Sequence, residues 1–334
     1  MNRVVLPYTE PMYSTYHWLS NAGIPAKGNK TSDIWYYNNT VNWYCKDMSL
    51  TKESSPDIKL TTGGIWNIPF LCKTAIDVYF IRHYLIEVIK TILEDGYYLA
   101  FNDADDYYIE GKTWYHDKHV FHDGMLVGYD DDKGIFLVAA YDYRWQFRVF
   151  ETPQQCFYDA MTIHGTEKIY GKLYAVKAKK DEQQLDIPLI YNSIEEYLAS
   201  EKVEPKKADY VYGIAVYDSI GQYLEYIRQG DIPFTEADQR VFRLIWEHKK
   251  CMYGRIQEVE TALGLKNSIS SEYETIVKAA DNLRYIFMKI FMTAYSEKHI
   301  NRMKDVLSEM KDKEGELLKG FMAQMRMKSV SSQF

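Results

Sequence analysis

The hydrophobic residues of this chain follow two different periods, and the change between them most constrains the fold. Between Tyr97 and Ala178 apolar and polar residues alternate in short runs, the pattern of strands with one buried face. After about Asp209 the apolar residues recur every three or four positions, as they do on amphipathic helices. We therefore predict an α+β fold, with an antiparallel sheet in the N-terminal part followed by a helical C-terminal domain.

The clearest pair of strands lies in the run from Met125 to Tyr141, MLVGYDDDKGIFLVAAY. Two apolar runs flank the polar segment Asp130–Gly134, and Gly134 can adopt the positive φ that a hairpin turn often requires. The run therefore predicts an antiparallel hairpin. Further strands are expected over Tyr97–Phe101, Tyr107–Ile109, Trp145–Glu151 and Lys172–Ala178, with a short helix from Pro153.

Capping residues and helical spacing predict the remaining elements. Ser32 and Asp33 are capping candidates for a helix over Ile34–Lys46, and the amphipathic stretch Thr74–Glu94 is expected to end at Gly96. The other expected helices are Ser14–Asn21, Ser193–Ser200, Val216–Gln229, Glu236–Leu263, Ser271–Ser296 and Lys298–Met325.

The length of 334 residues is about twice that of a typical domain, so two structural units are expected. Charged segments that contain or adjoin proline, Lys179–Glu182 and Glu201–Lys207, flank one short helix and have the composition of a boundary. We therefore predict an N-terminal domain over residues 1–180, a linker over 181–208 and a helical domain over 209–334.

Charge and hydropathy exclude several classes of partner. The net charge of −7 argues against a dedicated nucleic-acid-binding protein, because phosphate recognition depends on basic surfaces. The sequence contains no run approaching the roughly 20 apolar residues of a membrane span, and the N-terminus has no apolar core of a signal peptide. We therefore predict a cytoplasmic protein with no nucleic-acid or membrane partner.

Metal and cofactor sites are not expected. The four cysteines form no CxxC pair, so the chain lacks the spacing of a zinc knuckle or of a thioredoxin-type site. His116, His119 and His122 are spaced three residues apart, close to Asp123. In a strand only alternate residues share a face, so His119 would lie opposite the other two and could not complete a three-ligand site.

The segment Tyr115–Asp142 carries a resemblance to a known family. It contains a histidine, His122, followed by apolar residues, by Gly128, Tyr129 and Asp130, and by a second apolar strand. This order resembles the C-terminal half of papain-like cysteine peptidases. It is more closely similar to the butirosin BtrH N-terminal type, which includes transacylases of natural-product gene clusters such as that of the closthioamide pathway.

Other parts of the chain share this resemblance at the level of pattern. The N-terminal segment is rich in aromatic residues, and a Gly-Tyr-Tyr sequence precedes the acid-rich segment Asp103–Ile109. The helical part contains Glu247, His248 and Lys249, as in the related proteins. On a helix, these three residues alone would be interpreted as a solvated face or a domain contact.

The resemblance implies a catalytic role for His122 as the base. It implies that an acid just past the next strand orients this histidine, which would be Asp142, with Asp123 or Asp103 as alternatives. A base and its orienting acid must lie within hydrogen-bond reach of each other. Asp103, Asp123 and Tyr129 are the residues that we assign to substrate binding on this interpretation.

The family places a cysteine nucleophile at the start of the first buried helix, where the helix dipole lowers the thiol pKa. Here Ser14 occupies that region and no cysteine is present. Cys45 is an alternative, although it lies near the C-terminal end of its predicted helix. Cys72, just before the Thr74–Glu94 stretch, is better placed electrostatically but has no counterpart in the family.

The resemblance implies an acyltransferase of thiotemplated natural-product biosynthesis, which passes an acyl group from an acyl or peptidyl carrier protein to a small amine through a His-assisted nucleophile. The alternative is a catalytically degenerate papain-like scaffold that binds a peptide or a carrier protein; a true peptidase is less well supported because no nucleophile is recognisable. A basic docking surface for an acidic carrier protein is expected at Lys168, Lys172, Lys177, Lys179 and Lys180.

Overall fold

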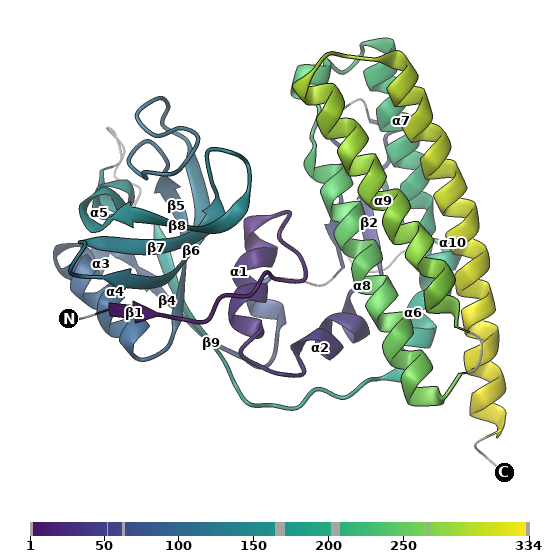
Figure 1. Ribbon diagram of the computed structural model, residues 1–334, viewed down its shortest axis with the longest axis horizontal. Coiled ribbons are helices and arrows are strands. Elements are labelled where there is room, and N and C mark those ends of the chain that lie inside the picture. Colours follow the sequence, from purple (N-terminus) through teal and green to yellow (C-terminus); the bar gives the residue numbers. More distant parts are fainter. Residues whose placement is uncertain are drawn as a thin grey trace. The chain divides into compact units, whose positions relative to one another are not determined.

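The computed structural model describes residues 3–51, 53–61, 64–163, 171–201, 208–265 and 268–331. The chain forms two compact units, each built from two segments. Unit 1 comprises residues 1–32 and 63–182, and unit 2 comprises residues 33–62 and 183–334. Figure 1 shows a sheet with a few helices in unit 1 and long helices in unit 2.

Unit 1 is organised around an antiparallel sheet, which confirms that part of the prediction. Within the described residues this sheet has seven strands in the order β4-β9-β5-β6-β7-β8, with β1 paired to the far end of β6. The strands are β1 (Arg3–Val5), β4 (Leu71–Asp77), β5 (Tyr98–Asp105), β6 (Phe121–Asp130), β7 (Ile135–Tyr141), β8 (Phe147–Pro153) and β9 (Lys172–Ala178). The β6–β7 hairpin turns where the sequence predicts, and Gly134 has a φ of 66°.

Helices cover both faces of this sheet. Figure 1 shows α3 (Val78–Ile81), α4 (Leu85–Glu94) and α5 (Gln154–Thr162) on one side and α1 (His17–Ala26) on the other. Leu85, Ile89 and Leu93 lie four residues apart on α4 and are buried in one core with β5, β6 and β7. Each such side chain contributes roughly 1.5–3 kcal/mol of burial free energy, so this stripe fixes α4 on the sheet.

Unit 2 combines helices with a small antiparallel sheet. In the part of the chain that the structure describes, this sheet has the order β10-β2-β3, formed by β2 (Trp43–Lys46), β3 (Lys59–Leu60) and β10 (Tyr210–Tyr212). Its helices are α2 (Ser32–Asn39), α6 (Ile187–Ala199), α7 (Val216–Gln229), α8 (Arg240–Leu263), α9 (Ile269–Met292) and α10 (Glu297–Ser331). Unit 1 also contains the short 3-10 helices η1 (Ile65–Asn67) and η2 (Arg82–Tyr84). Unit 2 contains η3 (Gly213–Ala215) and η4 (Phe234–Glu236).

The long C-terminal helices confirm the helical period, and α7 has the predicted bounds. No helix in the described ranges combines the length and the apolar character that a membrane crossing requires.

Two predicted helices are partly strands. The expected helix Ile34–Lys46 ends at Asn39, where the Thr40 hydroxyl donates to the Tyr36 carbonyl, and Trp43–Lys46 then pairs with β10. The expected helix Thr74–Glu94 begins as strand β4. At its end the Asp77 carboxylate accepts a hydrogen bond from the Tyr79 amide and caps α3.

The division of the chain also differs from the expected one. Residues 33–62 belong to the helical unit, because β2 pairs with β10 rather than with the larger sheet. The expected linker contains α6, whose Ile190, Ile194 and Tyr197 are buried in unit 2. Among the described residues, none beyond Gly213 joins the larger sheet.

Candidate active site

A histidine and a buried carboxylate form a close pair where β5 ends and β6 begins. His122 Nδ1 lies 2.6 Å from Asp106 Oδ2. Asp106 follows β5 directly, and its amide donates to the Val120 carbonyl at 2.9 Å, which holds the turn against the start of β6. The Asp106 side chain is 3% exposed and the His122 side chain 37% exposed. With the carboxylate on Nδ1, the neutral ring carries its proton there and leaves Nε2 as an acceptor.

A lysine lies on the other oxygen of the same carboxylate. Lys112 Nζ is 3.5 Å from Asp106 Oδ1, and its side chain is 3% exposed. Burial lowers the pKa of Lys112, and the nearby Asp106 carboxylate opposes this shift only in part. Asp106 therefore lies between an imidazole and a buried amine.

A second pair of the same kind is adjacent in sequence. His119 Nδ1 lies 2.7 Å from Asp105 Oδ2, and the imidazole stacks on Tyr107 with ring centroids 4.4 Å apart. This histidine side chain is 60% exposed, so its surroundings are much wetter than those of His122. In the described residues no group of three or more His, Cys, Asp or Glu side chains has the geometry of a metal site.

The first helix contributes to the surroundings of His122. His17, the first residue of α1, has its ring centroid 6.0 Å from that of His122 and 5.7 Å from that of Tyr141. The Tyr141 hydroxyl donates to the Ser14 carbonyl at 3.0 Å. The segment before α1, the end of β7 and the start of β6 therefore meet at this end of the sheet.

Asp142 follows β7, as predicted, but its carboxylate does not orient His122. Asp142 Oδ1 accepts hydrogen bonds from the Arg144 amide at 2.8 Å and the Gln146 amide at 3.0 Å, and Oδ2 accepts one from Arg148. Burial alone would raise the pKa of Asp142, but these hydrogen bonds outweigh burial and lower it. Asp142 therefore stabilises the β7–β8 turn, and the carboxylate that contacts His122 Nδ1 belongs to Asp106, which precedes β6.

The predicted substrate-binding residues lie in two places. Asp103 is exposed at an irregularity of β5, where it has a φ of 56°. Its amide hydrogen-bonds to Asp123, whose pKa is raised first by burial and then by the negative charge of Asp103. Tyr129 is instead part of the core, where its hydroxyl donates to Glu94 of α4, and it lies roughly 20 Å along β6 from His122.

Neither predicted thiol has the properties expected of a nucleophile for His122. Cys45 lies on β2 in unit 2, and burial raises its pKa to about 12, which opposes thiolate formation. Cys72 lies on β4, separated from β6 by β9 and β5, and three strand spacings amount to roughly 14 Å. Among the described residues of unit 1, neither a cysteine nor Ser14 forms a hydrogen bond with His122.

Comparison with known proteins does not assign a family. Neither a scan of protein-family models nor a search of curated proteins finds a match to this chain. The choice of a function therefore depends on the geometry of the site.

The Glu247-His248-Lys249 sequence is buried in unit 2 rather than solvated. Lys249 Nζ lies 2.9 and 3.0 Å from the two oxygens of Glu314, and 4.3 Å from the ring centroid of Trp43. His248 stacks on the same indole at 4.2 Å. The sequence contained a signal for this burial, because Ile245, His248, Lys249, Met252 and Ile256 recur with the helical period of one face of α8.

Tyrosines from other helices complete the Lys249–Glu314 cluster. The hydroxyl groups of Tyr197, Tyr217 and Tyr273 all donate to Glu314, the first two at 3.0 and 2.7 Å. The members come from α6, α7, α8, α9 and α10. Because every polar atom of Lys249 and Glu314 has a partner, we interpret this cluster as the polar centre of the helical packing.

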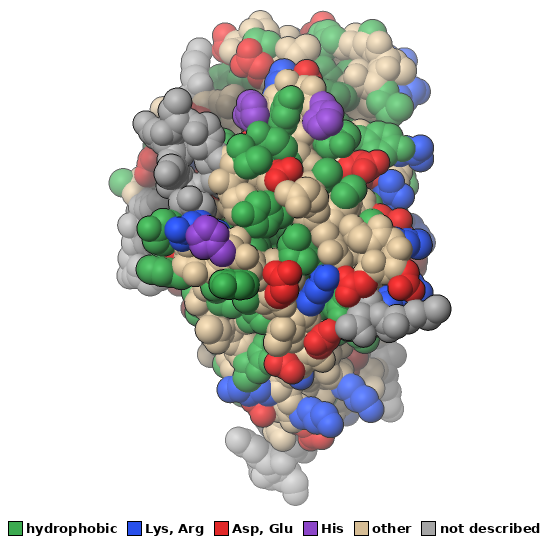
Figure 2. All heavy atoms as spheres, turned by 90° about the vertical axis from the view of Figure 1, so that its left-hand side faces the viewer, with side chains coloured by type: hydrophobic (Ala, Val, Ile, Leu, Met, Phe, Trp, Pro, Cys, Tyr) green, Lys and Arg blue, Asp and Glu red, His purple; other side chains and the backbone are tan. Residues whose placement is uncertain are grey.

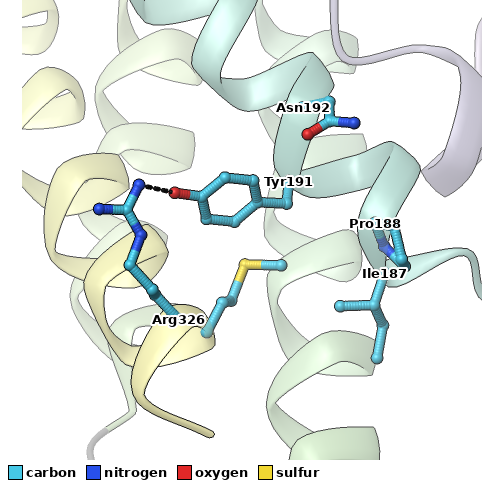
Figure 3. A pocket seen from close by; sticks show the side chains of 6 residues that line it. Ile187, Pro188, Tyr191, Asn192 and Arg326 are labelled. Atoms are coloured by element: carbon cyan, nitrogen blue, oxygen red, sulfur yellow. Dashed lines mark hydrogen bonds between the residues drawn. The ribbon is translucent and has the colours of Figure 1, made fainter. Parts of the chain in front are cut away.

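Unit 2 also contains a pocket that is separate from the histidine pairs. It has a volume of about 320 Å³ between α6 and the end of α10, and it is lined by Ile187, Pro188, Tyr191, Asn192, Met325 and Arg326. Figure 3 shows the Arg326 guanidinium directed at the Tyr191 hydroxyl. The lining has no acid and no histidine, so it offers no acid–base chemistry, and the candidate active site stays with His122 in unit 1.

The predicted basic docking surface is not a single patch. Lys172 and Lys177 are both exposed on β9, but they are an odd number of positions apart in a regular strand, so they lie on opposite faces of the sheet. Lys168 lies outside the described residues. On the face seen in Figure 2, Lys and Arg side chains are interspersed with Asp and Glu rather than gathered into one basic area.

Proposed function

We propose that unit 1 is a papain-like acyltransferase domain in which His122 is the general base and Asp106 its orienting acid. The observation that supports this most directly is the 2.6 Å contact between Asp106 Oδ2 and His122 Nδ1. The His122 side chain is also partly exposed, so substrate can reach Nε2. The acyl donor is a carrier-protein thioester, and the acceptor is a small amine.

The position of His122 in the fold supports the papain-like assignment. The residue opens a strand of an antiparallel sheet, and the first helix of the chain begins beside it. Amide groups in the first turn of a helix carry a partial positive charge, which can stabilise an oxyanion near the same place. The departure from the family pattern is the orienting acid, which precedes β6 instead of following β7.

In the proposed reaction, the acceptor amine attacks the thioester carbonyl carbon. The carbon–nitrogen bond forms, and His122 Nε2 takes the proton that leaves the nitrogen. The carbon–sulfur bond then breaks, and the same proton passes to the departing carrier thiolate. The attacking nitrogen is neutral, so a single proton is transferred; the negative charge of Asp103 near the site favours an acceptor that carries a separate cationic group.

The amine is assigned as the nucleophile because no thiol of the described unit 1 contacts His122. Ser14 is 1% exposed, which leaves a substrate carbonyl no direct approach to its hydroxyl. A Ser14→Ala variant should therefore transfer acyl groups within about threefold of the wild-type rate. Intact-protein mass spectrometry should show no acyl adduct on either protein. An adduct that disappears in the Ser14 variant would assign the nucleophile to Ser14 instead.

The proposed function is tested by incubating the protein with acyl-carrier thioesters and a panel of small amines. Amide formed in excess of the uncatalysed reaction, measured by liquid chromatography and mass spectrometry, is the expected result. The absence of a thiol beside His122 among the described residues also favours a second candidate, a scaffold that binds a carrier protein or peptide. Carrier binding with no amide formation would select the scaffold.

A further inference from the structure

The two oxygens of Asp106 face two different groups: Oδ2 forms a hydrogen bond with His122, whereas the buried Oδ1 has no hydrogen-bond partner among the described residues and lies at ion-pair distance from Lys112. Oδ2 contacts His122 Nδ1 at 2.6 Å, and Oδ1 faces Lys112 Nζ at 3.5 Å. Both the carboxylate and the lysine side chain are 3% exposed. Burying a charged group is costly unless it is paired, so an ammonium at this distance stabilises the buried carboxylate in its position.

The loop that carries Lys112 is held at several points. The Lys112 amide donates to the Ile109 carbonyl at 3.2 Å, and the Gly111 carbonyl accepts from the Tyr143 amide at 2.9 Å. Gly111 has a φ of 97°, and a Cβ atom there would lie 2.6 Å from the Phe150 ring. These contacts hold the loop backbone at the position from which the Lys112 side chain reaches Asp106.

Other charged or titratable groups lie around the three side chains. Asp123 interacts electrostatically with both Lys112 and His122, and Asp103 lies beside Asp123. The His17 ring of α1 lies 6.0 Å from the His122 ring, measured between centroids. Among these groups, Lys112 is the one paired with the second oxygen of Asp106.

We propose that Lys112 is a positioning residue: its ammonium pairs with Asp106 Oδ1 and so keeps Oδ2 directed at His122 Nδ1. His122 then remains in the tautomer whose Nε2 can accept a proton from the acceptor amine. Lys112 lies behind the carboxylate and is buried, so it does not touch the substrate. This inference rests on the proposed function for its catalytic consequence, but the state of the His122 ring can be measured without turnover.

The test uses Lys112→Met, which removes the charge and keeps much of the stem, and Lys112→Arg, which retains the charge. Lys118→Met is the matched control, because Lys118 is exposed and lies over Trp114 at 4.7 Å. The ¹⁵N NMR spectrum of the histidines reports the tautomer of His122, and circular dichroism reports folding. If Lys112→Met does not fold, Lys112→Gln provides the same comparison.

In wild type and in the Lys118 control, His122 should show the Nδ1–H tautomer. Lys112→Met should lose this preference, and amide formation should fall about 10- to 100-fold while KM for the amine changes less than threefold. Lys112→Arg should restore most of the tautomer preference.

A folded Lys112→Met or Lys112→Gln protein with an unchanged tautomer would overturn the inference. If the wild type shows no amide formation, the proposed function fails, but the NMR comparison still decides whether Lys112 controls the Asp106–His122 pair.

Discussion

A His122→Ala variant should form amide about 10²- to 10⁴-fold more slowly than the wild type, because a positioned general base contributes roughly this factor. The effect should appear in kcat, since the ring acts on the proton released as the carbon–nitrogen bond forms and not on substrate binding. Initial rates with a saturating carrier thioester, measured over a range of amine concentrations, separate the two parameters.

His119→Ala is the matched control for this substitution. His119 has the same contact with a neighbouring buried carboxylate, 2.7 Å to Asp105, but its ring is much more exposed. The control variant should retain the wild-type rate within about twofold. A His122→Ala protein that turns over at the wild-type rate, or an equal loss in both variants, would contradict the assignment of the base.

The second large effect is expected in the helical unit, where Glu314→Gln should lower the free energy of unfolding by about 3–5 kcal/mol. The substitution leaves the Lys249 ammonium buried without its counter-charge, and it removes an acceptor for the hydroxyl groups of Tyr197, Tyr217 and Tyr273. Chemical denaturation followed by far-ultraviolet circular dichroism measures the change.

A surface ion pair on the same helix provides the comparison. Lys311 of α10 contacts Asp218 at 2.7 Å, but both side chains are partly exposed, so Lys311→Gln should cost less than about 1 kcal/mol. The double variant Lys249→Met/Glu314→Gln should recover part of the loss, because it removes the unpaired charge. Equal stability of Glu314→Gln and wild type would show that the buried pair does not stabilise the packing.

The elements that the sequence predicts well are those determined by local signals. The turn at Asp130–Gly134 and the helix Val216–Gln229 depend on residues within one turn or one helical face, and both are present. Strand β2 was predicted as helix because its partner, β10, is distant in the sequence. Pairing between distant segments overrides local propensity, and it cannot be predicted from the sequence of either segment alone.

The candidate site was also predictable only where it depends on local signals in the sequence. The position of His122 at the start of a strand follows from the order of residues around the hairpin. The sequence does not predict that Asp106, rather than Asp142, Asp123 or Asp103, pairs with His122, because this pairing depends on the register shift between Phe101 and Ala104 in β5. That shift decides which carboxylates of the acidic loop turn inward, toward His119 and His122.

The pairing of Asp106 with His122 as the acid–base centre is tested most directly by the rates of amide formation of Asp106→Asn and Asp142→Asn, each confirmed as folded. Asp106→Asn should lose about 100-fold or more in kcat, because an amide can donate to Nδ1 and so favour the wrong tautomer. Asp142→Asn should stay within about threefold of the wild type, because its carboxylate serves the β7–β8 turn. A large loss in Asp142→Asn together with wild-type turnover in Asp106→Asn would contradict the assignment.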